Sequence, residues 1–594
     1  MNRARRNVDL IIALALLAAH AVAVLGYTSL FWGDNGRWLH EVERFAFGEL
    51  PYRDFQWHYP PLALWVVGTA ARLLGTDLAP VFLITSALAG LLVVAVVHYD
   101  REALGRSDPW VTAVCLVFAF AYAQTAGAPL PVGLYSPAAL IGALCITIAA
   151  VGFLRVFASD GGIGGAWWIG LFAGLAVLAK QDFWIPAAYL VALSAIRFRR
   201  LTPVAVSGGT VALGASIVAL TAGASVLRPL VGGFGHARIA GGMGFPSWER
   251  LTVELFAASL VVGFLAAMAS MARRRLYVAP LLACAIVATL TGAIHVMVSL
   301  SIVPADLGPF PTPTVEAMAY HVREGNPLLR PALGWLRLRV VGDPIPFVLS
   351  PLLLAAMAVR WARLDVTRRS TVALLLGFAV ALRARRAFEA TEWFEFLLTL
   401  PVILASAELL FGLAGTELHR FRSGTLAVLT VMSVTAYNVL GRGAGTRRRF
   451  PGVAIARGTV HWAPNALGDY HRVRAAIDSI DPGGGRPVFA FGFTGGWNYF
   501  LNRRNPFPFT QNFAFSAFDA DSVLITRPAG VILIDHSLID GTSFTSLDIR
   551  LDRWEQARVP TPYPSFDRPR FDRLRDGCPR IALDSTAFRV YACP

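Results

Sequence analysis

Long apolar segments follow one another along most of this chain, and they limit its fold more than any other feature. Each segment is long enough, or nearly so, to cross about 30 Å of hydrocarbon as a helix. Of the 594 residues, 55% are hydrophobic and 15% are charged, whereas soluble proteins contain about 25% charged residues. These values exclude a soluble enzyme and a disordered chain, and they predict an all-α polytopic membrane protein with about thirteen transmembrane helices. The first segment ends near residue 30, and the others cover 79–98, 109–126, 134–157, 165–179, 183–197, 202–222, 251–271, 277–300, 345–361, 370–384, 393–411 and 423–440.

Arginines at the ends of these segments predict the orientation of the protein. The basic start MNRARRNVDL leads into an apolar run that is too long for a cleaved signal peptide, and FWGDNG follows in place of a small-residue cleavage site. With the N-terminus in the cytoplasm, the arginine-rich loops at 197–200 and 273–275 lie inside, as the positive-inside rule requires. Residues 31–78 then form the first outer loop, and the end of the chain is extracytoplasmic. We expect a multi-pass protein of the inner (plasma) membrane. Its net charge of +15 is expected to interact with anionic membrane lipid rather than with nucleic acid.

The last part of the chain, residues 446–594, differs in character from the transmembrane domain at 1–445. Long apolar runs stop there, and the short β-like runs RPVFAFGF and AGVILIDHS follow a helix-like DYHRVRAAIDSI. Strands that alternate with helical patterns predict a small C-terminal extracytoplasmic α/β domain. Its only two cysteines, Cys578 and Cys593, are predicted to form a disulfide, which an oxidising exterior permits.

The first outer loop contains the first candidate for chemistry, Asp34, which directly follows the first apolar segment. Trp38 and Val42 then recur at helical spacing, with Arg37 and Glu41 elsewhere around the helix. This pattern predicts an amphipathic helix that lies on the membrane surface. A carboxylate fixed at that surface can take a proton from a hydroxyl while a sugar is transferred. The alternative is that Asp34 only caps the surface helix.

The same loop resembles a known superfamily. An Asp just past the first membrane helix, a surface helix, then PYRD and a YPP turn are similar to the integral-membrane glycosyltransferases of the GT-C superfamily. Within it, the chain most resembles bacterial proteins related to protein O-mannosyltransferases and lipid A aminoarabinose transferases. The stretch GLFAGLAVLAKQDFW fits the same group, and the resemblance extends over residues 9–200 and, more loosely, 370–410.

The resemblance implies a reaction and a set of site residues. A sugar carried on a polyprenyl phosphate would move to a lipid, glycan or protein acceptor at the outer face of the membrane. Asp34 would be the catalytic carboxylate, Asp54 matches the second acidic position, and His58 and Tyr59 match the stretch that lines the site. No nucleotide cofactor is needed. Some members use a divalent metal; here Asp34 and Asp54 are the only acidic pair for one, so a metal is possible but unsupported. No CxxC or HExxH pattern occurs, so we predict no zinc site.

The stretch Lys180–Gln181–Asp182 is the second candidate, at the outer end of the fifth predicted helix. Lys180 is the only lysine among 53 lysine and arginine residues. A lipid phosphate needs a cation at headgroup depth, and a lysine ammonium provides one as a point charge. The alternative is an anchor that extends its ammonium to water, although arginine would serve equally there. We predict that Lys180 contacts the donor phosphate, with Gln181 and Asp182 beside it.

The third candidate is the cluster RARRAFEATEWFEF at 383–396, whose arginines end the eleventh predicted helix on the outer side. The positive-inside rule disfavours arginine on that side, so an anionic partner such as a phosphate or an acidic sugar is expected. Internal pairing with Glu389 is the alternative. The candidate residues are Arg383, Arg385, Arg386, Glu389 and Glu392.

Together these features favour a GT-C-type glycosyltransferase that depends on a polyprenyl-phosphate sugar. A transporter or flippase of lipid-linked sugars would instead show internal symmetry and ionisable residues near helix midpoints, and no repeat is visible in the sequence. A ligase of lipid-linked sugars would place its key residues in a late outer loop. A non-catalytic envelope scaffold would use Asp34 only as a cap. These alternatives stay open at the level of the sequence.

Overall fold

The structure is a computed structural model of the full chain. The residues that it describes are 11, 34–55, 57, 59–104, 137–158, 163–224, 375, 377–378, 381–382, 452–461, 464–491, 496–508, 530–535, 575–585 and 588–594. The helices predicted at 109–126, 251–271, 277–300, 345–361, 393–411 and 423–440 lie outside these residues, and so do almost all of the first segment and of 370–384.

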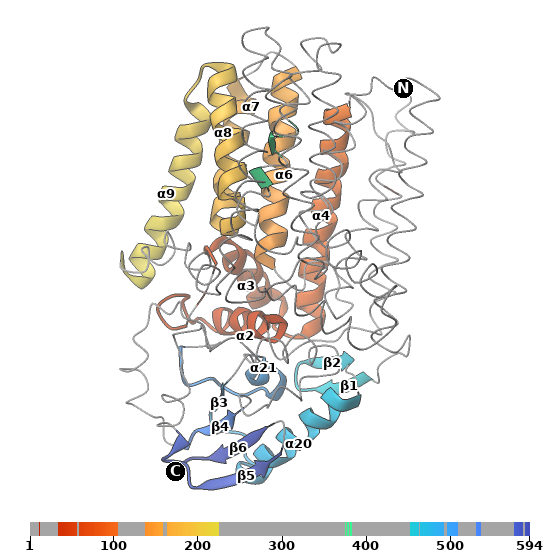
Figure 1. Ribbon diagram of the computed structural model, residues 1–594, viewed down its shortest axis with the longest axis vertical. Helices are drawn as coiled ribbons and strands as arrows, with labels where there is room; N and C mark the ends of the chain where they lie inside the picture. The colour runs from red at the N-terminus through yellow and green to blue at the C-terminus, as the bar shows by residue number, and fades with distance from the viewer. Residues whose placement is uncertain are drawn as a thin grey trace, which may run out of the picture.

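Apolar helices stand side by side along the long axis of the molecule (Figure 1). They are α4 (Leu78–Leu104), α6 (Pro137–Ala158), α7 (Ile163–Ala179), α8 (Trp184–Phe198) and α9 (Thr202–Ala222). In the part of the chain that the structure describes, three stretches are long and apolar enough to cross a membrane: Leu78–Tyr99, Pro137–Val156 and Thr202–Ala222. These helices match the segments predicted from the sequence at 79–98, 134–157, 165–179, 183–197 and 202–222.

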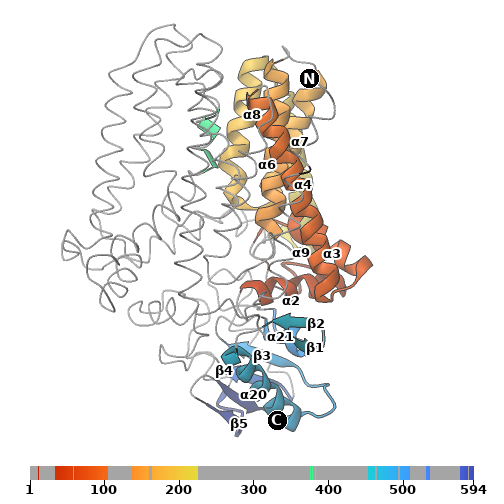
Figure 2. The same cartoon turned by 90° about the vertical axis from the view of Figure 1, so that its right-hand side faces the viewer.

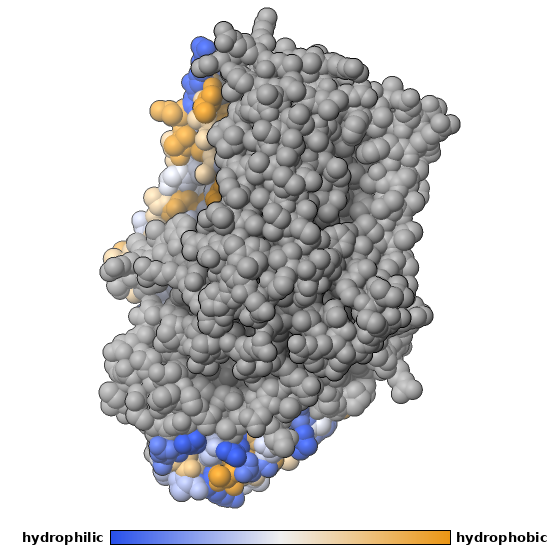
Figure 3. Space-filling model, viewed as in Figure 1, coloured by the Kyte–Doolittle hydropathy of each residue, from blue (hydrophilic) through white to orange (hydrophobic). Residues whose placement is uncertain are grey.

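Helices α7 and α9 approach each other closely because glycines face the contact. A Cβ on Gly170 would lie 2.6 Å from the carbonyl oxygen of Pro203, and one on Gly174 would lie 2.8 Å from the Cβ of Thr210. Small residues permit this kind of close packing between membrane helices. The outer side of α9 is apolar and exposed, for example at Leu213 and Leu220, and Figure 3 shows hydrophobic residues along this flank. That flank has the composition of a surface that contacts lipid.

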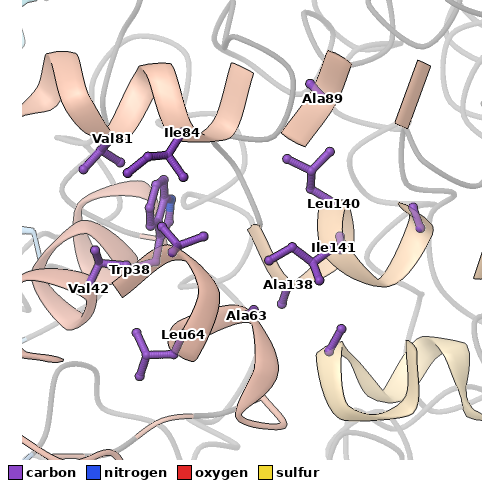
Figure 4. Close-up of a cluster of buried hydrophobic side chains, with 14 of the residues drawn as sticks. Trp38, Val42, Ala63, Leu64, Val81, Ile84, Ala89, Ala138, Leu140 and Ile141 are labelled. Carbon is purple, nitrogen blue, oxygen red and sulfur yellow. The ribbon is translucent and has the colours of Figure 1, made fainter. Parts of the chain in front are cut away.

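Two shorter helices, α2 (Asp34–Ala46) and α3 (Leu62–Leu74), lie at the lower end of these helices in Figure 1. The sequence predicted α2 but not α3, because LALWVVGTAARLL is too short to span a membrane and follows a proline turn. Side chains of both helices pack with side chains of α4 and α6 in one buried apolar cluster (Figure 4). The cluster contains Trp38 and Val42 of α2, Ala63 and Leu64 of α3, Val81, Ile84 and Ala89 of α4, and Ala138, Leu140 and Ile141 of α6.

The C-terminal region contains a four-stranded sheet in the order β3-β4-β6-β5. Strand β3 (Val488–Phe491) runs parallel to β4 (Ile532–Asp535), and β6 (Arg589–Ala592) is antiparallel to both β4 and β5 (Arg580–Asp584). Helix α20 (Pro464–Ile480) packs on β5 and β6, and α21 (Trp497–Leu501) packs on β3. A separate hairpin pairs β1 (Gly452–Ile455) with β2 (Gly458–His461). The region is therefore a mixed sheet with helices, and its boundary at 446 stays a prediction.

A disulfide closes the β5–β6 hairpin of this region. It joins Cys578, just before β5, to Cys593, just after β6. The guanidinium of Arg486 donates to the carbonyl oxygens of Gly530 and Cys593. The last residues of the chain are therefore fixed by a covalent bond and by charge-assisted hydrogen bonds.

The polar side of α2 is buried, which the prediction of an amphipathic helix on the membrane surface did not include. Its polar residues Arg37, His40, Glu41, Glu43 and Arg44 are all buried, and the C-terminal region contacts the helix at Glu43 and Arg44 (Figure 2). Three hydrogen bonds fix that region in place. Tyr499 Oη donates to Thr76 O over 2.7 Å, Arg44 Nη1 donates to Phe507 O over 2.9 Å, and Leu78 N donates to Arg457 O over 2.9 Å.

Candidate functional site

The candidate site begins on α2, which opens at Asp34 directly after the first predicted membrane segment. Arg37 follows one turn later and Glu41 two turns later, so the three positions share one side of the helix. The guanidinium of Arg37 lies 3.7 Å from the carboxylate of Glu41, and both side chains are almost fully buried, at 4% and 0% exposure. Charged residues are rarely buried to this extent unless they are paired.

Tyr59 joins α2 to the second candidate stretch. The Arg37 guanidinium carbon lies 5.7 Å from the centre of the Tyr59 ring, and Lys180 Nζ lies 5.9 Å from it. Both distances are within the range at which a cation is attracted to an aromatic face. The structure therefore brings together two residues that the sequence had singled out separately, Tyr59 and Lys180, and adds Arg37 to them.

The loop that carries Tyr59 is held tightly. Tyr52 has a left-handed backbone (φ 67°), which is costly for a bulky residue. It is held there because its backbone N–H donates to Phe55 O over 2.8 Å and its hydroxyl donates to Tyr59 O. Burial raises the pKa of Tyr52 well above its usual value, so the hydroxyl stays protonated as a donor. Trp57 adds an indole hydrogen bond to Pro60 O.

Lys180 stands at the junction between α7 and the short 3-10 helix η1 (Gln181–Phe183). Its ammonium lies 2.7 Å from Asp182 Oδ2, and the two side chains are 5% and 6% exposed. Gln181 is buried beside them. The ring of Phe183 packs against Gly142 of α6, where a Cβ would lie only 2.2 Å from it, and this fixes η1 against the helices. A lysine that anchors by reaching water would be exposed, so the geometry disfavours that alternative for Lys180.

Asp54 has a different environment from Lys180. Its carboxylate accepts hydrogen bonds from the Arg53 guanidinium and from the backbone N–H of Leu50. The hydrogen bonds from Arg53 hold the pKa of Asp54 below its usual value. Arg44 donates to the backbone oxygen of the same residue. Asp54 therefore organises the turn before Tyr59, and the oxygens that a metal would need already accept hydrogen bonds.

Several predicted site residues lie outside the described residues. They are His58 and the whole of the third candidate, Arg383, Arg385, Arg386, Glu389 and Glu392. The backbone of Asp34 is placed at the start of α2, and the direction of its side chain lies outside the description. Among the residues that the structure describes, no group of three or more His, Cys, Asp or Glu residues could hold a metal ion.

The sequence missed three residues that the structure adds to α2 and its surroundings. Arg37 and Glu43 read as the solvated side of an amphipathic helix, and Arg457 reads as one arginine among many. The signal that could have been used is the density of charge on α2. Five of the eight residues from Arg37 to Arg44 are ionisable, which exceeds what capping or surface exposure requires.

Comparisons with known proteins give structural matches alone. No protein-family model matches the chain, and no curated protein matches it. Among solved structures, the chain is similar to ArnT from Cupriavidus metallidurans bound to undecaprenyl phosphate, with 14% identity, a TM-score of 0.38, and coverage of 98% of this chain and 97% of that one. The apo form of the same protein gives 12% identity, a TM-score of 0.39, and 97% coverage of each chain.

A crystal structure of the Archaeoglobus fulgidus oligosaccharyltransferase in complex with Zn and sulfate is also similar. Its identity is 12% and its TM-score 0.42, with coverage of 90% of this chain and 68% of that one. Each of these three TM-scores is below 0.5, so the similarity does not establish a function.

Proposed function

We propose that this protein transfers a sugar from a polyprenyl-phosphate donor to an acceptor at the outer face of the plasma membrane. The observation that carries the proposal is the buried charged cluster of Arg37, Tyr59, Lys180 and Asp182, at the end of the apolar helices where α2 lies. Burying charges is costly, and an ion pair rarely repays that cost as stability. Such clusters therefore mark functional sites. The resemblance of the first loop to GT-C glycosyltransferases supports the same reaction.

The donor phosphate would bind beside Tyr59, between the two cations. An ammonium has three N–H donors, so Lys180 can bind Asp182 and a phosphate oxygen at the same time. The guanidinium of Arg37 offers a planar pair of donors that suits a second phosphate oxygen. Glu41 and Asp182 hold both cations in place before the donor arrives, so binding requires little rearrangement.

The transfer step assigns a proton to Asp34. The oxygen of the acceptor hydroxyl attacks the anomeric carbon of the sugar, and the bond from that carbon to the phosphate oxygen breaks. The polyprenyl phosphate leaves with the bonding electrons, and the hydroxyl proton moves to the carboxylate of Asp34. Because Asp34 and Arg37 lie one turn apart on α2, one helix supplies both the base and a ligand for the leaving phosphate. No step is assigned to a metal, since Asp54 is engaged with Arg53 and Leu50.

Binding of the lipid tests the donor assignment directly. Purified full-length protein in detergent would be titrated with a polyprenyl phosphate and, separately, with the polyprenol of the same chain length. We expect tight binding of the phosphate only, and a loss of about 10- to 100-fold in affinity for Lys180→Met, since a charged hydrogen bond contributes about 1.5–3 kcal/mol. Arg155→Met is the matched control, because Arg155 pairs with Glu102 and is half exposed. Equal binding of phosphate and alcohol would overturn the assignment.

Deletion of the gene tests the reaction as a whole. Mass spectrometry of envelope glycans and of lipid-phosphate sugars should show the loss of one modification and the accumulation of its donor. A flippase predicts that the donor accumulates at the cytoplasmic face, and a scaffold predicts no specific donor. Unchanged glycans and unchanged lipid-linked sugars would reject sugar transfer.

A further inference from the structure

A chain of buried contacts links the C-terminal region to α2. Arg457 lies in the turn between β1 and β2, and its guanidinium pairs with Glu43 Oε1. The other carboxylate oxygen of Glu43 lies 3.2 Å from His40 Nδ1. His40 and Glu43 are among the most buried polar side chains of the described residues, at 3% and 5% exposure. The same turn accepts a hydrogen bond from Leu78 N, so it is fixed to the start of α4 as well.

The burial of His40 and the contacts of its two ring nitrogens favour the neutral form. A carboxylate only accepts hydrogen bonds, so the imidazole proton is on Nδ1 and points to Glu43. The other nitrogen, Nε2, has no hydrogen-bond partner in the part of the chain that the structure describes. Protonation would therefore bury a second N–H donor without an acceptor, which is unfavourable. Since His40 stays neutral, the negative charge of Glu43 is balanced by Arg457.

The surrounding charges agree with this arrangement. Burial is the largest influence on His40 and lowers its pKa, and Glu43 opposes that effect without cancelling it. Arg44 lowers the same pKa and Glu49 raises it. The charged or titratable groups around the contact chain are Glu43 and Arg44 on α2, Glu49 after it, Asp77 before α4, and Arg457 and Tyr499 of the C-terminal region.

We propose that Arg457 is a positioning residue for the site on α2, and that its ion pair with Glu43 fixes the rotation of this helix. Six residues separate Arg37 from Glu43, which places them about 120° apart around the helix axis. Arg457 therefore holds one edge of the polar side of α2, while Tyr59, which also lies against Lys180, contacts Arg37 at the other edge. The assignment of Asp34 as the catalytic residue and of Arg37 as a donor-binding residue rests on the proposed function. The contact chain itself does not.

Thermal unfolding at two pH values tests the contact chain without any substrate. Full-length protein would be melted at about pH 7.5 and about pH 5.5, on either side of the ordinary His pKa of about 6.5. Because the folded-state pKa of His40 is lowered, the unfolded chain binds a proton that the folded protein does not, and stability is lost as the pH falls below about 6.5. In Arg457→Gln, the unbalanced Glu43 raises the pKa of His40 again. The acid-induced fall in Tm should therefore be smaller than in the wild type.

Four further variants make this test specific. Arg457→Lys should restore the wild-type acid response, because it restores the charge. In a His40→Asn background, Arg457→Gln should leave the acid response unchanged. Arg474→Gln, which removes an exposed arginine on α20, should behave as the wild type. Glu43→Gln removes the negative charge itself, so its Tm should fall with acid at least as steeply as that of the wild type. This variant keeps the test valid if Arg457→Gln folds poorly. A wild-type acid response in Arg457→Gln would overturn the proposal.

Lipid binding connects the contact chain to the site. With a polyprenyl phosphate as the probe at about pH 7.5, Arg457→Gln should bind on the order of tenfold more weakly, because small displacements of a site residue are costly. Arg457→Lys should recover most of the affinity. If even the wild type does not bind the probe while the acid responses follow the pattern above, the proposed function fails and the role of Arg457 in fixing α2 stands. If the wild type binds the probe and Arg457→Gln matches it, the positioning role is wrong.

Discussion

Ion pairs lie at both ends of the apolar helices α4, α6 and α7, and they differ in a way that separates the proposed site from an ordinary surface. At the far end, Arg155 of α6 bonds to Glu102 of α4 over 2.7 Å, with the arginine 54% exposed. At the end near α2, Lys180 and Asp182 have the same separation but are almost completely buried. Exposed pairs contribute about 0–1 kcal/mol, whereas buried pairs carry a desolvation cost that stability alone seldom repays. The contrast teaches that burial, rather than the presence of a salt bridge, distinguishes the Lys180–Asp182 pair of the proposed site from the Arg155–Glu102 pair.

Substitution of Asp34 should give the largest effect, and it tests whether the end of the apolar helices near α2 is catalytic. Asp34→Asn removes a base at neutral pH, so sugar transfer should fall by about 10²–10⁴-fold. Loss of a specific glycan, measured by complementation of the deletion strain at native expression level, checks this.

The choice of Asn controls for the capping alternative. Asn caps a helix as well as Asp does, so Asp34→Asn should keep normal expression and normal binding of polyprenyl phosphate. Full complementation by this variant would reject the catalytic role and return Asp34 to that of a cap.

Removal of Lys180 should give the next largest effect and tests the cost of the buried charges. Lys180→Met leaves Asp182 buried without its cation, which should lower the free energy of unfolding by about 3–5 kcal/mol. The double variant Lys180→Met/Asp182→Asn should recover most of this stability but none of the affinity for polyprenyl phosphate. Denaturation in detergent and lipid titration measure the two effects separately. Recovery of both would mean that the pair is structural only.

The disulfide of the C-terminal region should have an intermediate effect. By the chain-entropy estimate for a loop of about 15 residues, Cys578→Ser should cost about 3 kcal/mol. Because this region contacts α2 at Glu43 and Arg44, hydrogen exchange at the amides of 34–46 should rise in the variant. Exchange at the far end of α6, at 151–158, should stay as in the wild type. Equal changes at both ends would show that the cover is not local to α2.

The sequence predicted the apolar helices well because burial in lipid is decided locally, by a run of apolar residues. It also singled out Lys180 by composition, and the structure places this residue against Tyr59. It missed the burial of α2, since the polar partner of that helix lies far along the chain. Arg457 and Glu43 are separated by 414 residues, and no periodicity links positions so far apart. Helix α3 was missed because it is apolar but shorter than a membrane span.

The exposed pair at the far end should give the smallest effect, and it is the sharpest check on the comparison. Arg155→Gln removes the charge that bonds Glu102 but keeps a side chain of similar length. Since both groups are in contact with solvent, the free energy of unfolding should change by at most about 1 kcal/mol, and less at high salt. Binding of polyprenyl phosphate should be unchanged. A loss comparable to that of Lys180→Met, measured in the same denaturation assay, would mean that the two ends are equivalent and that burial does not distinguish the site. A small loss at this end together with a large one at Lys180 would assign the difference to desolvation, because the two ion pairs share the same 2.7 Å separation.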